Sequence, residues 1–154
     1  MKLAQIDRAI ETCREHLAQT NSQGTEVEAF LAQYLSVMIC GAFEEEIERI
    51  VVQRLAASND PEIEAFARSA LDAVFRSTGV KEISGLLNRF NPEVKRRFQE
   101  RVCGTRAETF FTNIVTHRHQ TVHSGGSNVT VRELADFYDE GHTVLDAISG
   151  ALQP

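Results

Sequence analysis

The chain has few residues that interrupt helices. Its 154 residues include three prolines and nine glycines, which are scattered, so neither a linker nor a low-complexity segment is expected. A run of 18 uncharged apolar residues is also lacking, so no transmembrane helix is expected. The first residues mix acidic and basic side chains, unlike a signal peptide. We therefore expect a single domain over residues 1–154 with one hydrophobic core.

Cysteine is equally scarce. The three cysteines, Cys13, Cys40 and Cys103, are an odd number at wide spacing. Each falls in an apolar helical pattern, which favours buried thiols over a disulfide framework. We interpret all three as reduced core thiols of a cytoplasmic protein.

Basic residues are fewer than acidic residues. Sixteen Lys and Arg against 22 Asp and Glu give a formal net charge of −6, which argues against nucleic-acid binding by bulk electrostatics. Residues 81–118 differ, because eight Lys or Arg against four Glu leave +4 there and −10 on the remainder. A local basic zone is therefore expected within an acidic protein.

Alternating strand patterns are absent, and helix signals recur along the whole chain. Capping boxes and Asx-Pro pairs mark several helix starts: Thr25-x-x-Glu28, Asp60-Pro61, Asn91-Pro92, Thr105-x-x-Glu108 and Thr130-x-x-Glu133. Helical periods follow these signals. They predict a first helix with Leu3, Ile6, Ile10, Cys13 and Leu17 on one face, then helices over residues 26–57, 61–76, 81–89, 92–102, 106–123 and 131–152. The expected fold is all-α, an up-and-down helical bundle with additional short helices.

One arginine conflicts with this pattern. On the predicted helix over residues 106–123, Arg118 lies seven residues after Phe111 and four after Ile114, so it continues the apolar stripe. A guanidinium there is costly unless it has a partner or a function. Glu44 lies on an apolar side of the helix over residues 26–57 and is the natural partner. We predict a buried ion pair between Arg118 and Glu44.

Two histidines follow this arginine. His119 and His123 form an i, i+4 pair, whereas Arg118 and His123 are five residues apart and diverge by about 140° on an ideal helix. They converge only if the helix ends near His123, where Ser124-Gly125-Gly126 supplies a stop, or if they meet across a symmetric dimer.

These residues resemble a HEPN domain. The resemblance rests on Phe43-Glu44, on the R-x4-H pattern from Arg118 to His123, and on a final helix opened by Thr130; the nearest branch is the RiboL-PSP group. It implies a metal-independent endoribonuclease without a cofactor, in a homodimer whose cleft unites both R-x4-H motifs. Such proteins commonly occur in toxin–antitoxin and other defence systems, which implies an RNA substrate and an antitoxin or regulatory partner. A polar residue, often Asn or His, directly follows the arginine in the family; here it is His119, where many family members have Asn.

The implied chemistry suits the residues. Attack by the RNA 2′-hydroxyl needs a base, an acid for the leaving 5′-oxygen, and positive charge on the phosphorane. His123 titrates near neutrality and serves as base or acid, while Arg118 binds the phosphate. Glu44 would orient Arg118, and His119 would contact the phosphate or tune His123. Four more basic residues either guide the RNA backbone or form a solvated helix face. They are Lys95, Arg96, Arg97 and Arg101.

Two alternatives stand beside this hypothesis. His117, His119 and His123 offer nitrogen ligands for zinc, but no HExxH or CxxC accompanies them, and Arg118 would oppose a dication. Alternatively, the chain is a catalytically inactive HEPN-like bundle that acts as a binding or regulatory module.

Overall fold

Helices make up the regular structure of this protein. The computed structural model describes residues 2–57, 60–74, 78–124 and 129–153, with the side chains of 72–74 and 121–124 left out. Within these residues the chain forms eight helices: α1 (Ala4–Thr20), α2 (Glu26–Ala56), α3 (Pro61–Val74), α4 (Val80–Phe90), α5 (Pro92–Val102), α6 (Arg106–Ser124), α7 (Val131–Gly141) and α8 (Thr143–Leu152). The all-α bundle expected from the sequence is confirmed. The expected end of the third helix, at residue 76, lies outside the described residues.

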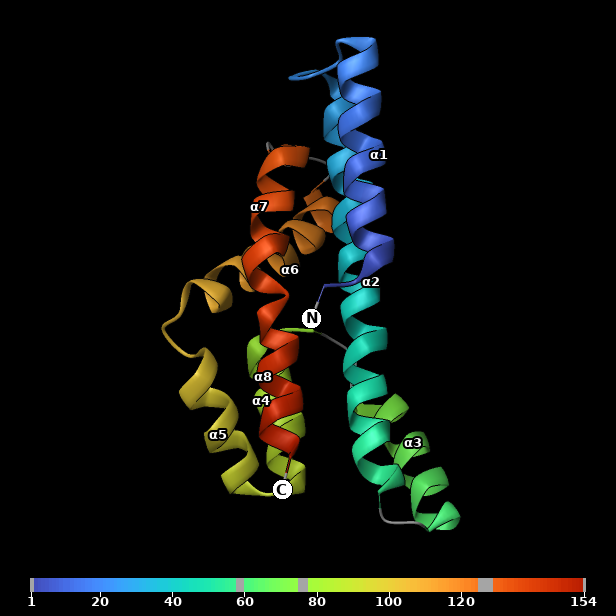
Figure 1. Cartoon of the computed structure of the whole chain (residues 1–154), viewed down its shortest axis with the longest axis vertical. Coiled ribbons are helices and arrows are strands. Elements are labelled where there is room, and N and C mark those ends of the chain that lie inside the picture. The colour runs from blue at the N-terminus through green and yellow to red at the C-terminus, as the bar shows by residue number, and fades with distance from the viewer. Residues whose placement is uncertain (1, 58–59, 75–77, 125–128, 154) are drawn as a thin grey trace.

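The helices are arranged around α2, the longest of them (Figure 1). Its first half packs against α1, its second half against α3, and its other contacts are with α6, α7 and α8. Length and composition alone would allow α2 to span a membrane. A helix that is apolar on several sides is also what a bundle core requires, and the packing of α2 on five other helices assigns it that role.

The helix starts follow the capping signals, with one variation. Thr130 and Glu133 form a complete capping box at α7. At α2 and α6 the glutamate instead reaches back to a glycine: Glu28 accepts from the Gly24 N–H and Glu108 from the Gly104 N–H, both at 2.7 Å. Both glycines have positive φ, 71° and 77°, which favours glycine at that position. The carboxylates therefore close the turns that precede these two helices.

The prediction of one helix over residues 131–152 is wrong in one respect. The structure has two helices there, α7 and α8, separated at His142. Glycine weakens the helix at position 141, where a Cβ would lie 3.0 Å from the Phe111 backbone nitrogen. Thr143 Oγ1 donates to the Glu140 carbonyl at 2.7 Å, a local bond that competes with the helical ladder. The expected buried face still continues across the break: Val131, Leu134, Ala135, Tyr138, Leu145, Ile148 and Leu152 are all buried.

The cysteine prediction is correct for two residues and wrong for the third. Cys13 and Cys40 are buried free thiols, whereas Cys103 is exposed. Cys103 is the first residue beyond α5, where its backbone is extended. The helical period that predicts burial stops at that point, so the apolar spacing no longer applies to it.

Glu28 connects the start of α2 to the start of α7. Glu28 is 8% exposed, and its carboxylate also accepts from the Val131 N–H at 3.2 Å. We expect Glu28→Gln to lower the free energy of unfolding by about 1–3 kcal/mol, because an amide has one acceptor oxygen and leaves one N–H without a partner. Urea denaturation measures this loss, with Glu26→Gln on the exposed first turn of α2 as control. Equal midpoints for the two variants would contradict it.

Candidate functional site

A stack of three aromatic rings holds α2, α6 and α7 together beside Glu44. The Phe43 ring lies 5.0 Å from that of Phe111 and 6.1 Å from that of Tyr138, with interplanar angles of 8° and 20°. All three side chains are fully buried. Offset-stacked rings of this size add packing energy beyond their buried area. The stack therefore sets the position of α2 against α6 next to the residues that follow.

Arg118 and Glu44 form the expected ion pair. Arg118 Nη1 donates to Glu44 Oε1 at 2.8 Å, which joins α6 to the middle of α2. The expected burial is only partial, because the two side chains keep 30% and 33% of their surface exposed. The pair is thus held on its inner side and reachable from solvent. A half-exposed guanidinium held by a carboxylate can still offer donors to an incoming anion.

Cys40, one turn before Glu44 on α2, lies next to this pair. Burial raises the pKa of its thiol to about 12, with the charge of Arg118 opposing that shift and Glu44 adding to it. A thiol with so high a pKa stays protonated near neutral pH and is a poor nucleophile. The ion pair therefore borders the protein core, where burial disfavours the thiolate of Cys40.

The two site histidines occupy the end of α6. His119 is exposed and directly follows Arg118, and the backbone of α6 stays helical through Ser124. Positions 118 and 123 therefore diverge by about 140° around this helix. The His123 side chain and the glycines at 125 and 126 lie outside the described residues. The last helical residue of α6 is Ser124, so the helix ends near His123 as expected, and both routes to convergence of Arg118 and His123 stay open.

His117, the residue before Arg118, is turned into the bundle. It is 2% exposed, and neither ring nitrogen has a hydrogen-bond partner among the described residues. His119 is exposed on the same helix, so these two proposed zinc ligands do not share a site. No group of three or more His, Cys, Asp or Glu in the described residues is placed to hold a metal ion.

Burial lowers the pKa of His117 below its ordinary value of 6.5. The unfolded chain therefore takes up a proton at a higher pH than the folded protein does. We expect the free energy of unfolding to fall as the pH drops below about 6.5. His117→Leu should remove that part of the pH dependence, and it leaves no polar atom unpaired.

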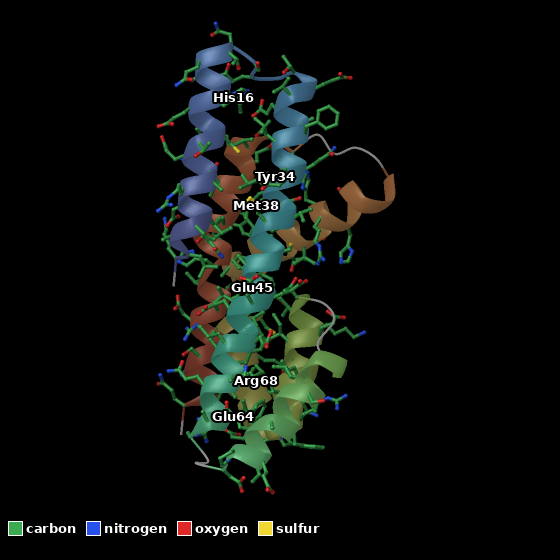
Figure 2. All side chains as sticks on the ribbon, turned by 90° about the vertical axis from the view of Figure 1, so that its right-hand side faces the viewer. His16, Tyr34, Met38, Glu45, Glu64 and Arg68 are labelled. Carbon is green, nitrogen blue, oxygen red and sulfur yellow. The ribbon has the colours of Figure 1, made fainter. Side chains whose placement is uncertain are left out.

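Urea denaturation at about pH 7.5 and about pH 5.5 measures this effect. The control is His16→Leu, which replaces an exposed histidine of α1 (Figure 2). The expectation fails if the wild type and His117→Leu lose the same free energy of unfolding between the two pH values.

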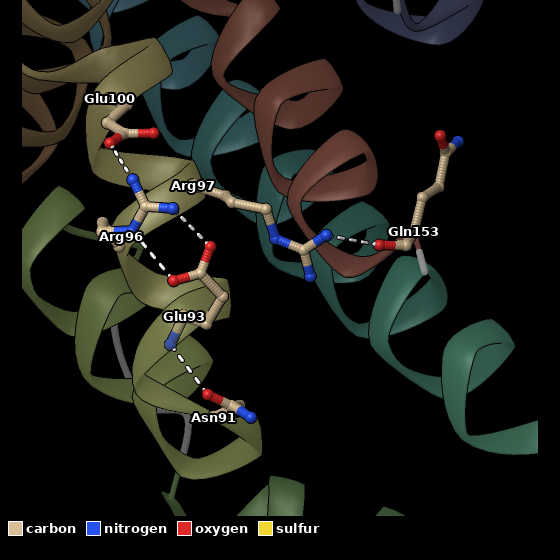
Figure 3. A network of polar contacts seen from close by, with 6 residues as sticks. All are labelled: Asn91, Glu93, Arg96, Arg97, Glu100 and Gln153. Carbon is tan, nitrogen blue, oxygen red and sulfur yellow. Dashed lines mark hydrogen bonds and ion pairs between the residues drawn. The ribbon is translucent and has the colours of Figure 1, made fainter.

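The basic residues of α5 are engaged locally. Arg96 pairs with both Glu93 and Glu100, and the hydrogen bond with Glu93 raises the pKa of the guanidinium. Arg97 Nη1 donates to the Gln153 carbonyl at 2.9 Å (Figure 3). These contacts are those of a salt-bridged helix face that anchors the end of α8.

The same helix lies away from the Arg118–Glu44 pair. α5 packs on α4 and α8, on the side of the bundle opposite α2 (Figure 1). Lys95 is half-buried there, and the Arg101 guanidinium lies against Gly150 of α8. The structure therefore pairs Arg118 with Glu44 and exposes His119 as the next residue of α6. Among the described side chains, the four basic residues of α5 form no ion pair or hydrogen bond with Arg118 or Glu44.

An apolar stripe on α2 leads directly to Glu44. Four side chains at spacings of three and four residues are exposed: Val27 at 43%, Phe30 at 66%, Tyr34 at 63% and Val37 at 44%. Gly41 continues the spacing, and a Cβ there would meet nothing within 4 Å. Figure 2 shows Tyr34 on this face, above Glu45. The sequence pattern did not single out these residues, because α2 is apolar on several sides and periodicity alone does not say which side is covered.

The comparisons with known proteins agree with this architecture. The family model described as RiboL-PSP-HEPN matches residues 2–153. No curated protein and no solved structure matches the chain. The matched range includes the aromatic stack, the Arg118–Glu44 pair and the R-x4-H pattern.

Proposed function

The chain belongs to the RiboL-PSP-HEPN family, and on that premise we propose that it is a metal-independent endoribonuclease. It cleaves RNA by attack of the 2′-hydroxyl, in a cleft shared by two copies of the chain. The observation that carries the proposal is the half-exposed Arg118, held by Glu44 at 2.8 Å on an otherwise apolar helix stripe. An arginine on that stripe is better explained by a task at the surface than by stability, because a partly exposed ion pair contributes little.

In this proposal Arg118 stabilises the charge that develops on the scissile phosphate. Its guanidinium is protonated at every working pH and can offer two parallel donors to phosphate oxygens. Glu44 restricts the rotamers of the arginine before the substrate arrives. Preorganised donors are most effective because they need no rearrangement during the reaction. Glu44 is therefore a positioning residue, and Arg118 contacts the RNA.

The proton transfers fall to the histidines. His123 takes the proton of the attacking 2′-hydroxyl or supplies one to the leaving 5′-oxygen, since imidazole changes charge near neutral pH. His119 is exposed beside Arg118 and contacts the phosphate or tunes His123. The bond from phosphorus to the 2′-oxygen forms as the bond to the 5′-oxygen breaks. The products are a 2′,3′-cyclic phosphate and a 5′-hydroxyl end.

The apolar stripe of α2 is the face through which two copies associate. Val27, Phe30, Tyr34 and Val37 form one band that ends seven residues before Glu44. A two-fold axis across this band places two Arg118–Glu44 pairs at the edges of the same interface, since a two-fold contact uses the same patch on both partners. Aromatic side chains at a solvent-exposed patch are typical anchors of such contacts.

The setting of the activity follows from the same proposal. An RNase of this kind acts in the cytoplasm as a toxin or defence component, and an antitoxin or other regulatory protein restrains it. If the chain is instead an inactive HEPN-like bundle, it uses the same fold as a binding or regulatory module and leaves RNA intact.

Incubation of the purified protein with mixed RNAs in EDTA tests the proposed function. The expected result is cleavage that EDTA does not inhibit, with 2′,3′-cyclic phosphate ends detected by mass spectrometry of the fragments. Cleavage that requires a divalent ion, or that leaves 3′-hydroxyl ends, would overturn the mechanism. Intact RNA under all conditions would favour the binding module.

A further inference from the structure

A second exposed apolar feature lies on α3, away from the α2 stripe. Phe66 is 76% exposed and Ile63, one turn earlier, is 50% exposed. Single exposed apolar side chains are ordinary, but two large ones on the same turn next to a cavity indicate a contact surface. α3 lies against the second half of α2, beside α4 (Figure 2).

Phe66 forms one edge of an apolar cavity of about 250 Å³ between three helices. Val51 and Leu55 of α2 form its floor, Ala70 continues the α3 wall, and Leu86 and Arg89 belong to the α4 wall. The volume is below the range of about 300–1,000 Å³ that small-molecule sites occupy. It suits a large apolar side chain that a partner inserts as an anchor.

Charge identifies the kind of partner. Among the described side chains, Arg89 is the one charged side chain that lines the cavity, and none of them forms a hydrogen bond or an ion pair with it. On α4 itself, Lys81 and Arg89 against Glu82 leave a charge of +1. A cation at the rim of an apolar cavity selects a carboxylate beside an apolar anchor.

We propose that the groove between α2, α3 and α4 binds an acidic amphipathic helix of a partner protein. The helix inserts a large apolar side chain beside Phe66 and places a carboxylate on Arg89. Together α2, α3 and α4 line a groove. Such a groove is the kind of surface to which a partner's amphipathic helix binds. This inference does not depend on RNA cleavage, because none of its residues belongs to the Arg118 site.

Selection from a displayed library of helical peptides on the full-length protein tests this proposal. The expected result is enrichment of peptides with apolar residues at helical spacing flanked by Asp or Glu. Fluorescence anisotropy should show that Phe66→Ser and Arg89→Glu each weaken the selected peptide about tenfold or more. Replacement of the peptide's acids by Lys should restore binding to Arg89→Glu. Arg8→Glu, at an exposed arginine of α1, is the control and should leave affinity unchanged.

Three results would overturn the proposal. One is that no enriched peptide depends on Phe66. Another is that the selected peptides are basic or that reversal of their charge fails to restore binding to Arg89→Glu. The third is that Phe66→Ser lowers the mass of the protein in sedimentation, because a second copy of the chain would then occupy the groove. Circular dichroism of each variant confirms that the helices are retained, so a loss of binding reports the groove.

Discussion

Arg118→Ala is expected to lower the rate of RNA cleavage by about 10²–10³-fold, the usual effect of removing one preorganised donor from a developing oxyanion. The loss should appear in kcat more than in KM, because the guanidinium is most effective when charge accumulates on the phosphate. Arg118→Lys should recover only part of the rate, since an ammonium cannot offer two parallel donors. Single-turnover cleavage of a labelled RNA measures both variants.

Arg68→Ala is the matched control for this experiment. Arg68 pairs with Glu64 at 3.0 Å on α3 and is 50% exposed, so its removal breaks an ion pair of similar geometry away from the site. It should leave the cleavage rate unchanged. If folded Arg118→Ala cleaves as fast as Arg68→Ala, the arginine has a structural role and the proposed mechanism is wrong.

The double variant Phe30→Asp with Tyr34→Asp should dissociate the dimer and abolish cleavage. Both side chains are more than 60% exposed in the single chain, at 66% and 63%, so the substitutions should not disturb its folding. Across a two-fold interface they would bury uncompensated carboxylates, at a cost of about 3–5 kcal/mol or about 10²–10⁴-fold in Kd. Sedimentation velocity reports the mass, and the cleavage assay reports the activity.

The corresponding substitutions on α3, Ile63→Asp with Phe66→Asp, are the control. They add the same charge at another exposed apolar site, so they separate a specific interface from a general effect of charge. The dimer interpretation fails if both double variants sediment like the wild type. It also fails if the α2 variant is monomeric and cleaves RNA at the wild-type rate.

Much of the fold follows from local sequence signals. Asp60 and Asn91 accept hydrogen bonds from the first N–H groups of α3 and α5, as an Asx residue before proline predicts. The Arg118–Glu44 pair was predictable for a different reason. A charge on an apolar stripe requires a partner, and few other carboxylates occupy an apolar side of a neighbouring helix.

Other features depend on how the helices pack against one another, which local sequence patterns do not reveal. The buried residues keep the same helical spacing on both sides of His142, so the sequence pattern does not reveal the break between α7 and α8. The exposure of the α2 stripe depends on which sides of α2 the other helices cover. The ion pairs of Arg96 could have been predicted from the sequence. Glu93 lies three residues before it and Glu100 four residues after it, which is ion-pair spacing on a helix.

The most direct test of the shared site combines two inactive variants. After subunit exchange, half of the dimers formed from equal amounts of Arg118→Ala and His123→Ala carry one subunit of each kind. Such a dimer has one intact combination of Arg118 from one subunit and His123 from the other. The mixture should recover about one quarter of the wild-type cleavage rate, although each variant alone is inactive. A mixture that stays inactive while native mass spectrometry shows the mixed dimer would contradict a site built from both subunits.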